Sequence, residues 1–274
     1  MSAWICATCG HQHADTPVPP PACRICTDPR QWVRWEGQEW TTLEELRGEG
    51  HTVEIRPIEA GLIGLAIAPS RFIGQRALIV ITPAGNVMWD CFGFIDATAV
   101  AAVTAIGGLA AVSASHPHFY GAMVEWARAF DAPIHLPEAD ARWVMRPDPS
   151  IAFYRDSAEP LPGVRLIRCG GHFPGSAVLH WPEGAAGRGV LLTGDTFTVV
   201  RDRSWVSVMW SYPNLIPLDT ATVRRVGGAV AGLGFDRLYG GWWDSVIDHD
   251  ATNAVARSID RLAVMLSGAH DLEM

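Results

Sequence analysis

The sequence predicts an α+β fold in which two β-sheets pack together with helices outside, preceded by a small module of different composition. Short β-rich runs occur in both halves of the chain, and helical segments follow each set. Four of the six cysteines lie in the first 26 residues, where little apolar material is present. Since 49% of the 274 residues are hydrophobic, the rest of the chain can bury a large core. We therefore expect a module over residues 1–35 and a domain over residues 36–274.

Charge and hydropathy exclude several classes of partner. With 21 basic and 29 acidic side chains the net charge is −8, so we expect no nucleic acid partner. The long uncharged stretch over residues 97–124 is interrupted by Gly107 and Gly108, which predicts a helix, a turn and a strand and no membrane contact. The first cysteine precedes any basic or apolar leader segment. We therefore expect a cytoplasmic protein.

The first half of the large domain begins with strands and continues with alternating helices and strands. Runs of β-branched and apolar residues predict strands, and a Pro-Ala-Gly-Asn sequence predicts the hairpin turn between the third and the fourth. The predicted strands cover residues 52–56, 61–68, 77–81 and 86–89. Two helices, at residues 98–106 and 122–130, then alternate with strands at residues 109–113 and 134–136.

The second half of the large domain also begins with predicted strands and continues with helices. Three further apolar runs predict strands, and longer segments with helical periodicity follow them. These strands cover residues 164–168, 177–181 and 190–193. A helix at residues 220–233, a strand at 237–239 and a final helix at 251–266 complete the domain. Strands followed by helices in both halves favour two packed sheets with outer helices.

Two CxxC pairs separated by 13 residues predict a metal site in the N-terminal module. Each pair can direct both sulfurs of a turn at one ion, and together they supply the four thiolates of a tetrahedral site: Cys6, Cys9, Cys23 and Cys26. The segment resembles a zinc ribbon or a rubredoxin-like knuckle. Zinc and iron both suit four sulfurs, and the small number of nearby aromatic residues favours structural zinc. Because four cysteines complete the site, we expect His11 and His13 to be exposed.

Three histidines and one aspartate follow strands in the large domain. His116 and His118 come directly after the strand that ends at residue 113, and two side chains at this spacing can converge on one ion. His172 lies in a Gly-rich turn after another strand, and Asp195 follows an apolar run. The set predicts a site for one zinc or iron ion. A turn-capping role is the alternative for Asp195.

In this order the motifs resemble those of the metallo-β-lactamase-fold hydrolase superfamily, from about residue 52 to the C-terminus. The matching segments are Val87-Met88-Trp89-Asp90, Ser115-His116-Pro117-His118, Gly171-His172 and Thr193-Gly194-Asp195-Thr196. The resemblance implies an αββα four-layer sandwich with a metal site at one edge. It also implies that the ligands are His116, His118, His172 and Asp195. Asp90 is expected to support the histidine loop by hydrogen bonds.

The departures from the family pattern predict a single ion. Where the HxHxDH motif of the family continues with Asp and His, this chain has Tyr120 and Gly121. The last histidine of the family, which follows a strand and a glycine, is replaced by Trp242 and Trp243. Without that aspartate, Tyr120 or Asp195 must act on the attacking water, unless the metal alone activates it. Tyr120 is also a candidate hydrogen-bond donor to the oxyanion.

Aromatic residues near these motifs predict an apolar pocket over the metal. Its expected walls are Phe119, Phe173, Trp210, Tyr212, Trp242 and Trp243. The polar Asn214 is expected to orient a ligand. Such a pocket favours a small or apolar substrate over a highly charged one. A homodimer interface is the alternative use of this tryptophan-rich face.

We therefore expect a metal-dependent hydrolase that acts on a small ester, lactone or thioester. Two alternatives stay open. A mononuclear iron oxidoreductase, similar to the persulfide dioxygenases of the superfamily, is consistent with two histidines and a carboxylate around iron. A non-catalytic binding or sensor protein is consistent with the lost ligands. The four-cysteine segment beside this fold is also found in flavodiiron systems, which we disfavour because the chain lacks a flavodoxin-like domain and a di-iron carboxylate pattern.

Overall fold

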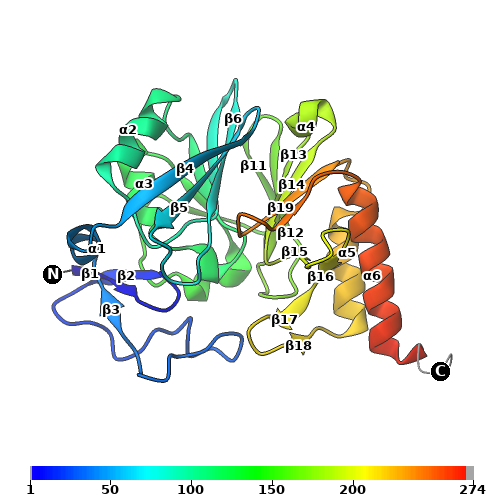
Figure 1. Cartoon of the computed structure of the whole chain (residues 1–274), viewed down its shortest axis with the longest axis horizontal. Helices are drawn as coiled ribbons and strands as arrows, with labels where there is room; N and C mark the ends of the chain where they lie inside the picture. The colour runs from blue at the N-terminus through cyan, green and yellow to red at the C-terminus, as the bar shows by residue number, and fades with distance from the viewer. Residues whose placement is uncertain (1, 270–274) are drawn as a thin grey trace.

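The structure is a computed structural model, which describes residues 2–269, and its larger sheet has seven strands (Figure 1). In chain order these are β4 (Thr52–Glu59), β5 (Leu62–Ala68), β6 (Ala77–Thr82), β7 (Gly85–Trp89), β8 (Ala111–Ser113), β9 (Ile134–Pro137) and β10 (Ile151–Tyr154). Strands β4 to β7 form an antiparallel meander, and β7 to β10 run parallel. The helices that connect β7 to β8 and β8 to β9 are those that the sequence predicts.

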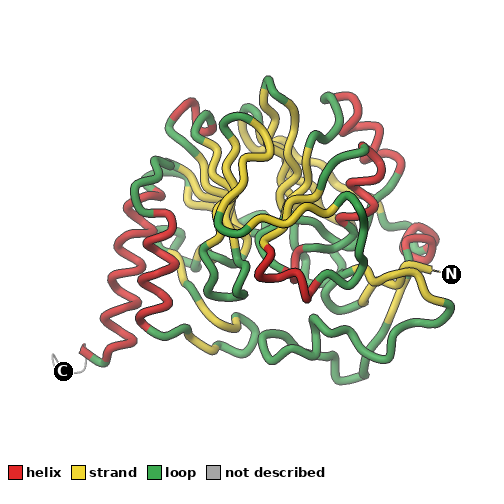
Figure 2. Tube along the Cα trace, turned by 180° about the vertical axis from the view of Figure 1, so that it is seen from behind, coloured by secondary structure: helices red, strands yellow, loops and turns green. Residues whose placement is uncertain are grey.

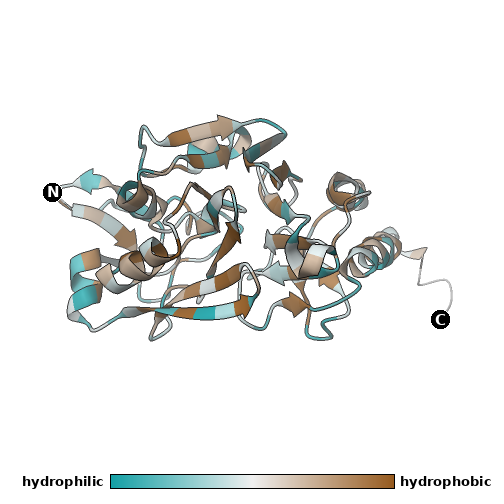
Figure 3. Ribbon diagram, turned by 90° about the horizontal axis from the view of Figure 1, so that it is seen from above, coloured by the Kyte–Doolittle hydropathy of each residue, from teal (hydrophilic) through white to brown (hydrophobic). Residues whose placement is uncertain are grey.

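The second sheet has six strands, in the order β11, β12, β13, β14, β19, β20. Their bounds are β11 (Ser157–Leu161), β12 (Val164–Arg168), β13 (Ala177–Trp181), β14 (Val190–Gly194), β19 (Arg237–Gly240) and β20 (Val246–Ile247). All neighbours are antiparallel except β14 and β19. Fully buried residues of both sheets, such as Val80, Trp89 and Leu179, form one core between them. Figure 3 shows that the central strands carry mostly hydrophobic residues.

Helices cover the outer face of each sheet, so the layers are α, β, β, α (Figure 2). Helices α2 (Ala97–Ala105) and α3 (Met123–Phe130) lie on the larger sheet, and α5 (Thr220–Val230) and α6 (Ala251–Ser267) lie on the second. Asp96 and Asp219 cap α2 and α5 by accepting backbone N–H hydrogen bonds. Among the helices of residues 2–269, none combines the length and hydropathy that a membrane span requires.

Several short elements were not predicted. They are the strands β10, β11 and β20, α1 (Leu43–Gly48), α4 (Gly184–Gly187), two 3₁₀ helices, Pro117–Phe119 and Glu138–Trp143, and the hairpins β15 (Thr198–Val199) with β16 (Val206–Ser207) and β17 (Met209–Ser211) with β18 (Ile216–Pro217). The two hairpins lie between β14 and α5. They place residues 196–217 beside the carboxyl end of β14, where Asp195 lies.

The N-terminal segment forms a three-stranded sheet that packs onto the large domain. Strand β1 (Ser2–Cys6) pairs with β2 (Gln12–Thr16) and with β3 (Trp40–Thr41), so the sheet extends past the expected boundary at residue 35. The cysteines and Ile25 share one buried cluster with residues of the larger sheet and α3. His11 and His13 are only 1% and 6% exposed, so the expectation that they are exposed is wrong. The packing of this hairpin on the large domain buries both rings.

Candidate metal centres

The structure brings His116, His118, His172 and Asp195 together, although they come from three separate strand ends. His116 and His118 follow β8, His172 lies in the turn between β12 and β13, and Asp195 follows β14. One ligand atom from each residue lies within 4.8 Å of all the others. All four residues are buried, and Asp195, at 6%, is the most exposed of them.

Hydrogen bonds outside the group fix which nitrogen of His116 faces it. Ser115 Oγ lies 2.9 Å from His116 Nδ1, which leaves Nε2 directed at the group, 3.5 Å from Asp195 Oδ2. The backbone N–H of Ser115 donates to Asp90 Oδ1 over 2.7 Å. The prediction that Asp90 supports the histidine loop is therefore confirmed, and burial raises the pKa of Asp90 to about 8.

His172 is held in the same way from its other side. Its Nδ1 donates to the carbonyl of Trp210 over 2.9 Å, and its Nε2 lies 3.3 Å from His118 Nδ1. A tetrahedral ion with bonds of about 2.0–2.1 Å to nitrogen requires ligand atoms about 3.3–3.4 Å apart. The observed separations of 3.3 and 3.5 Å match this requirement.

Burial sets the charge state of the four side chains. It lowers the pKa of His116 and His118 well below the usual histidine value and that of His172 to about 4, so the rings are neutral and offer lone pairs. Burial also raises the pKa of Asp195 to about 7. His116 Nε2 has no hydrogen-bond partner among residues 2–269. A cation would satisfy this atom and the carboxylate together, so the group fits a metal ion.

The structure leaves no room for further ligand side chains at two glycines near the group. Gly121 stands where the family motif has histidine, and a Cβ there would lie 2.5 Å from the backbone carbonyl of Phe92. At Gly241 a Cβ would lie 2.6 Å from the ring of Phe119, which packs on His116 with centroids 4.6 Å apart. Backbone and an apolar ring thus occupy the space that further ligands would need.

The four cysteines form a second candidate metal centre. Their sulfurs lie within 4.8 Å of one another, with 3.6 Å between Cys6 and Cys26 and 3.8 Å between Cys9 and Cys23. A tetrahedral ion with bonds of about 2.3 Å to sulfur requires sulfur pairs about 3.8 Å apart. All four are buried and form no disulfide. The spacing of the four sulfurs therefore also fits a metal ion.

The segment that follows Cys9 connects the two centres. His11 Nδ1 lies 3.3 Å from the carbonyl of Pro117, which separates the two ligands of the histidine loop. The backbone N–H of Gln12 donates to the carbonyl of Gly121 over 3.1 Å, at the end of the same loop. Burial lowers the pKa of His11 to about 4. The four-cysteine module therefore supports the histidine loop from outside.

Comparisons with known proteins agree with this architecture. No protein-family profile matches the sequence. The chain is 45% identical over 265 residues to YmaE of Bacillus subtilis (strain 168), an uncharacterized protein, and the match covers 95% of this chain and 96% of YmaE. The chain belongs to the YmaE family.

Solved structures show the fold of this YmaE-family protein. The metallo-β-lactamase FIM-1 from Pseudomonas aeruginosa, in its mono-zinc form, is similar with a TM-score of 0.58 at 15% identity, covering 77% of this chain and 96% of FIM-1. A B3 metallo-β-lactamase with an active-site glutamic acid has a TM-score of 0.53 at 15% identity and covers 89% of this chain and 99% of its own. The predicted metallo-β-lactamase-like αββα fold is confirmed.

Four of the expected pocket residues surround the histidine/aspartate group of this YmaE-family chain. The ring of Phe173 lies 5.0 Å from those of His118 and His172, and Phe119 lies between His116 and Trp242. The ring of Tyr212 lies 5.4 Å from that of His172, and its hydroxyl donates to the carbonyl of Asp195 over 2.9 Å. Trp210 contributes the carbonyl that orients His172. These contacts place an aromatic wall around the group.

Three predicted residues of the YmaE-family chain lie elsewhere. Trp243 stacks under the guanidinium of Arg56 at 4.2 Å, beside β5. The amide of Asn214 donates to backbone carbonyls of residues 29 and 31, so it holds the N-terminal module in place of a ligand. Tyr120 is fully buried against His11, and burial and the carboxylate of Asp140 raise the pKa of its hydroxyl. We therefore assign Tyr120 no part in the reaction.

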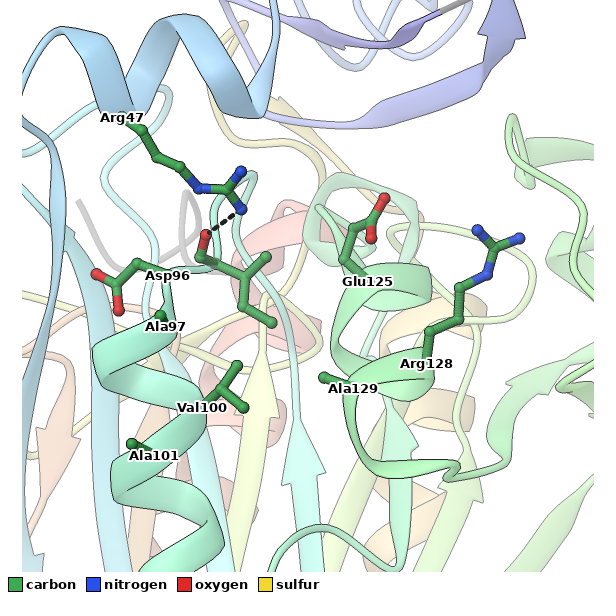
Figure 4. Close-up of a pocket in the computed structure, with 9 residues that line it drawn as sticks. Arg47, Asp96, Ala97, Val100, Ala101, Glu125, Arg128 and Ala129 are labelled. Atoms are coloured by element: carbon green, nitrogen blue, oxygen red, sulfur yellow. Dashed lines mark hydrogen bonds between the residues drawn. The ribbon is translucent and has the colours of Figure 1, made fainter.

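Cavities lie both beside the group and away from it. One of about 570 Å³ is lined by Trp242 and by Thr198, whose hydroxyl donates to Asp195 Oδ1 over 3.4 Å. Another, of about 740 Å³, lies between α1, α2 and α3, where Arg47 donates to the carbonyl of Ile95 (Figure 4). No predicted site residue lines the second cavity. None of the four donor residues lines either cavity, and Thr198 is the residue of the first cavity that contacts the group.

Sequence analysis missed two residues that contact this site of the YmaE-family chain. Ser115 precedes the histidine pair directly, and its place in the motif was a signal that it orients His116. Arg30 had no such signal. Its guanidinium lies over the ring of Phe173, which only the packing of the N-terminal module on the large domain brings about.

Proposed function

We propose that the histidine/aspartate group is a mononuclear metal centre at which a small ester, lactone or thioester is hydrolysed. The observation that carries this proposal is the convergence of four buried donor atoms within 4.8 Å at one edge of a metallo-β-lactamase fold. When bound there, the ion would polarise the substrate carbonyl and lower the pKa of a water molecule. We propose zinc for this centre and for the four-cysteine centre.

The protein's own residues hold the site in one arrangement. Ser115 and the carbonyl of Trp210 fix the rings of His116 and His172, so each ring presents Nε2 without reorganisation. Asp195 supplies the negative charge of the group. The carboxylate oxygen of Asp195 that does not bind the metal would accept a proton from water and return it to the leaving group.

The aromatic wall excludes bulk water from these steps. Phe119 and Phe173 are fully buried and contact the histidine rings. Exclusion of water strengthens the electrostatic interactions between the site and a developing oxyanion. The wall favours a small substrate with apolar groups beside the reacting carbonyl.

The test uses full-length protein loaded with zinc and a panel of 4-nitrophenyl esters, lactones and thioesters. Asp195→Asn and His172→Ala should each lower kcat/KM by about 1000-fold, because metal assistance contributes several kcal/mol. His180→Ala is the matched control. It is also a buried histidine, but its Nε2 hydrogen bonds to the carbonyl of Gly234, outside the group.

Two outcomes would contradict the proposal. If iron fills the site in the purified protein and oxygen is consumed with a thiol or persulfide substrate, the iron oxidoreductase replaces the hydrolase. If the site is fully occupied by metal and no ester, lactone or thioester is hydrolysed, a binding or sensor protein replaces the hydrolase as the proposed function.

A further inference from the structure

We propose that Arg30, which the four-cysteine module supplies, binds a carboxylate group of the substrate. This inference rests on the proposed function and deepens it, because it adds a charged group to the small ester, lactone or thioester that is hydrolysed. Arg30 lies four residues after Cys26, outside the part of the chain that resembles the metallo-β-lactamase superfamily.

Residues of the large domain hold the loop that carries Arg30. The hydroxyl of Ser211 donates to the carbonyl of Arg30 over 3.0 Å. The amide of Asn214 donates to the carbonyls of Pro29 and Gln31 over 2.9 and 3.2 Å. These three hydrogen bonds attach the loop to the same segment whose Trp210 carbonyl orients His172. The position of Arg30 is therefore fixed relative to the candidate metal centre.

Two aromatic rings bound the guanidinium of Arg30. Its central carbon lies 4.6 Å from the centroid of Phe173 and 4.8 Å from that of Trp210. Phe173 also contacts the rings of His118 and His172, so a single ring separates the cation from the candidate ligands. Stacking occupies the faces of a guanidinium and leaves its N–H edge for a planar anion.

The N–H groups of Arg30 are only partly satisfied. Asp28 accepts from Nη1 over 2.8 Å and also from the backbone N–H of Arg30. Nε is buried and has no partner among residues 2–269, and the side chain is only 11% exposed. A carboxylate beside the centre would complete this arrangement.

The test compares two esters that share a leaving group and differ in charge. We would measure kcat/KM of the zinc-loaded full chain for neutral 4-nitrophenyl acetate and for the anionic mono-4-nitrophenyl ester of succinic acid. Calorimetric titration with succinate and with neutral succinamide gives a second readout that needs no turnover. Arg261→Gln is the matched control, because Arg261 stacks on Trp205 at 3.6 Å but lies on α6.

Arg30→Gln should lower the anionic-to-neutral ratio of kcat/KM by about tenfold or more, mainly through KM, and weaken succinate binding similarly. Arg30→Lys keeps the charge but not the planar guanidinium, so it should lower both the kcat/KM ratio and the affinity for succinate by about threefold. This variant tests the inference if Arg30→Gln does not fold. Arg261→Gln should change neither.

Unchanged ratios and unchanged succinate affinity in both Arg30 variants, at wild-type metal content, would overturn the inference. The same result with intact hydrolysis of the neutral ester would leave the proposed hydrolase in place. Conversely, if neither ester is hydrolysed but succinate binding still depends on Arg30, the proposed hydrolase is refuted and carboxylate binding by Arg30 is supported.

Discussion

Gly121 provides a quantitative test of the steric argument for a single ion. Its φ is +47°, a left-handed conformation that costs other residues about 1–2 kcal/mol. A Cβ there would also lie 2.5 Å from the carbonyl carbon and oxygen of Phe92, and overpacking of this kind costs about 1–3 kcal/mol. We therefore expect Gly121→Ala to lower the free energy of unfolding by about 2–5 kcal/mol.

Gly163→Ala separates the two contributions. Its φ is +79°, but nothing lies within 4 Å of its Cβ position, so we expect a loss of only about 1 kcal/mol. Urea unfolding of the zinc-loaded proteins measures both values. If Gly121→Ala unfolds within about 1 kcal/mol of Gly163→Ala, the steric argument is wrong. A stable Gly121→His variant that gains one ion per chain would refute it as well.

Two further predictions concern residues around the group. Burial raises the pKa of Asp140 to about 7 from its usual 3.8, so the unfolded chain releases this proton first as the pH rises. Asp140 alone should therefore lower the free energy of unfolding by up to about 4 kcal/mol between about pH 4 and 7. Asp140→Asn should remove this share of the slope in urea titrations at several pH values, while buried Asp90, whose pKa is also raised, keeps its own share. An unchanged slope would contradict it. Ser115→Ala should weaken zinc binding at the histidine/aspartate group about 10–100-fold in chelator competition, because His116 loses its orienting partner, and wild-type affinity would count against that role.

The sequence predicted which four side chains converge because their spacing is a local property. A histidine pair directly after a strand, and an aspartate directly after another, have their direction set by the strand ends alone. The main strands and helices agree with the predicted ranges to within a few residues, for the same reason. Hydrophobic periodicity reports which face of an element is buried, and both sheets follow it.

The features that the sequence did not predict depend on contacts between distant parts of the chain. His11 and His13 are buried because the β1–β2 hairpin packs on the large domain, which no local pattern encodes. Trp243 was placed in the pocket with its neighbour Trp242, but the turn after β19 directs it to the other side, onto Arg56. Short hairpins such as β15–β16 lack the length that a periodicity requires.

The central claim is that the chain holds two separate metal centres, one in each of the two groups. The most direct test is the metal content per chain, by elemental analysis, of protein purified without added metal. We expect two zinc ions in the wild type, and one in the paired variant Cys6→Ser/Cys9→Ser. We also expect one in His172→Ala, with the cysteine-bound ion retained. Two ions retained in His172→Ala, or none in the large domain of the wild type, would contradict the account.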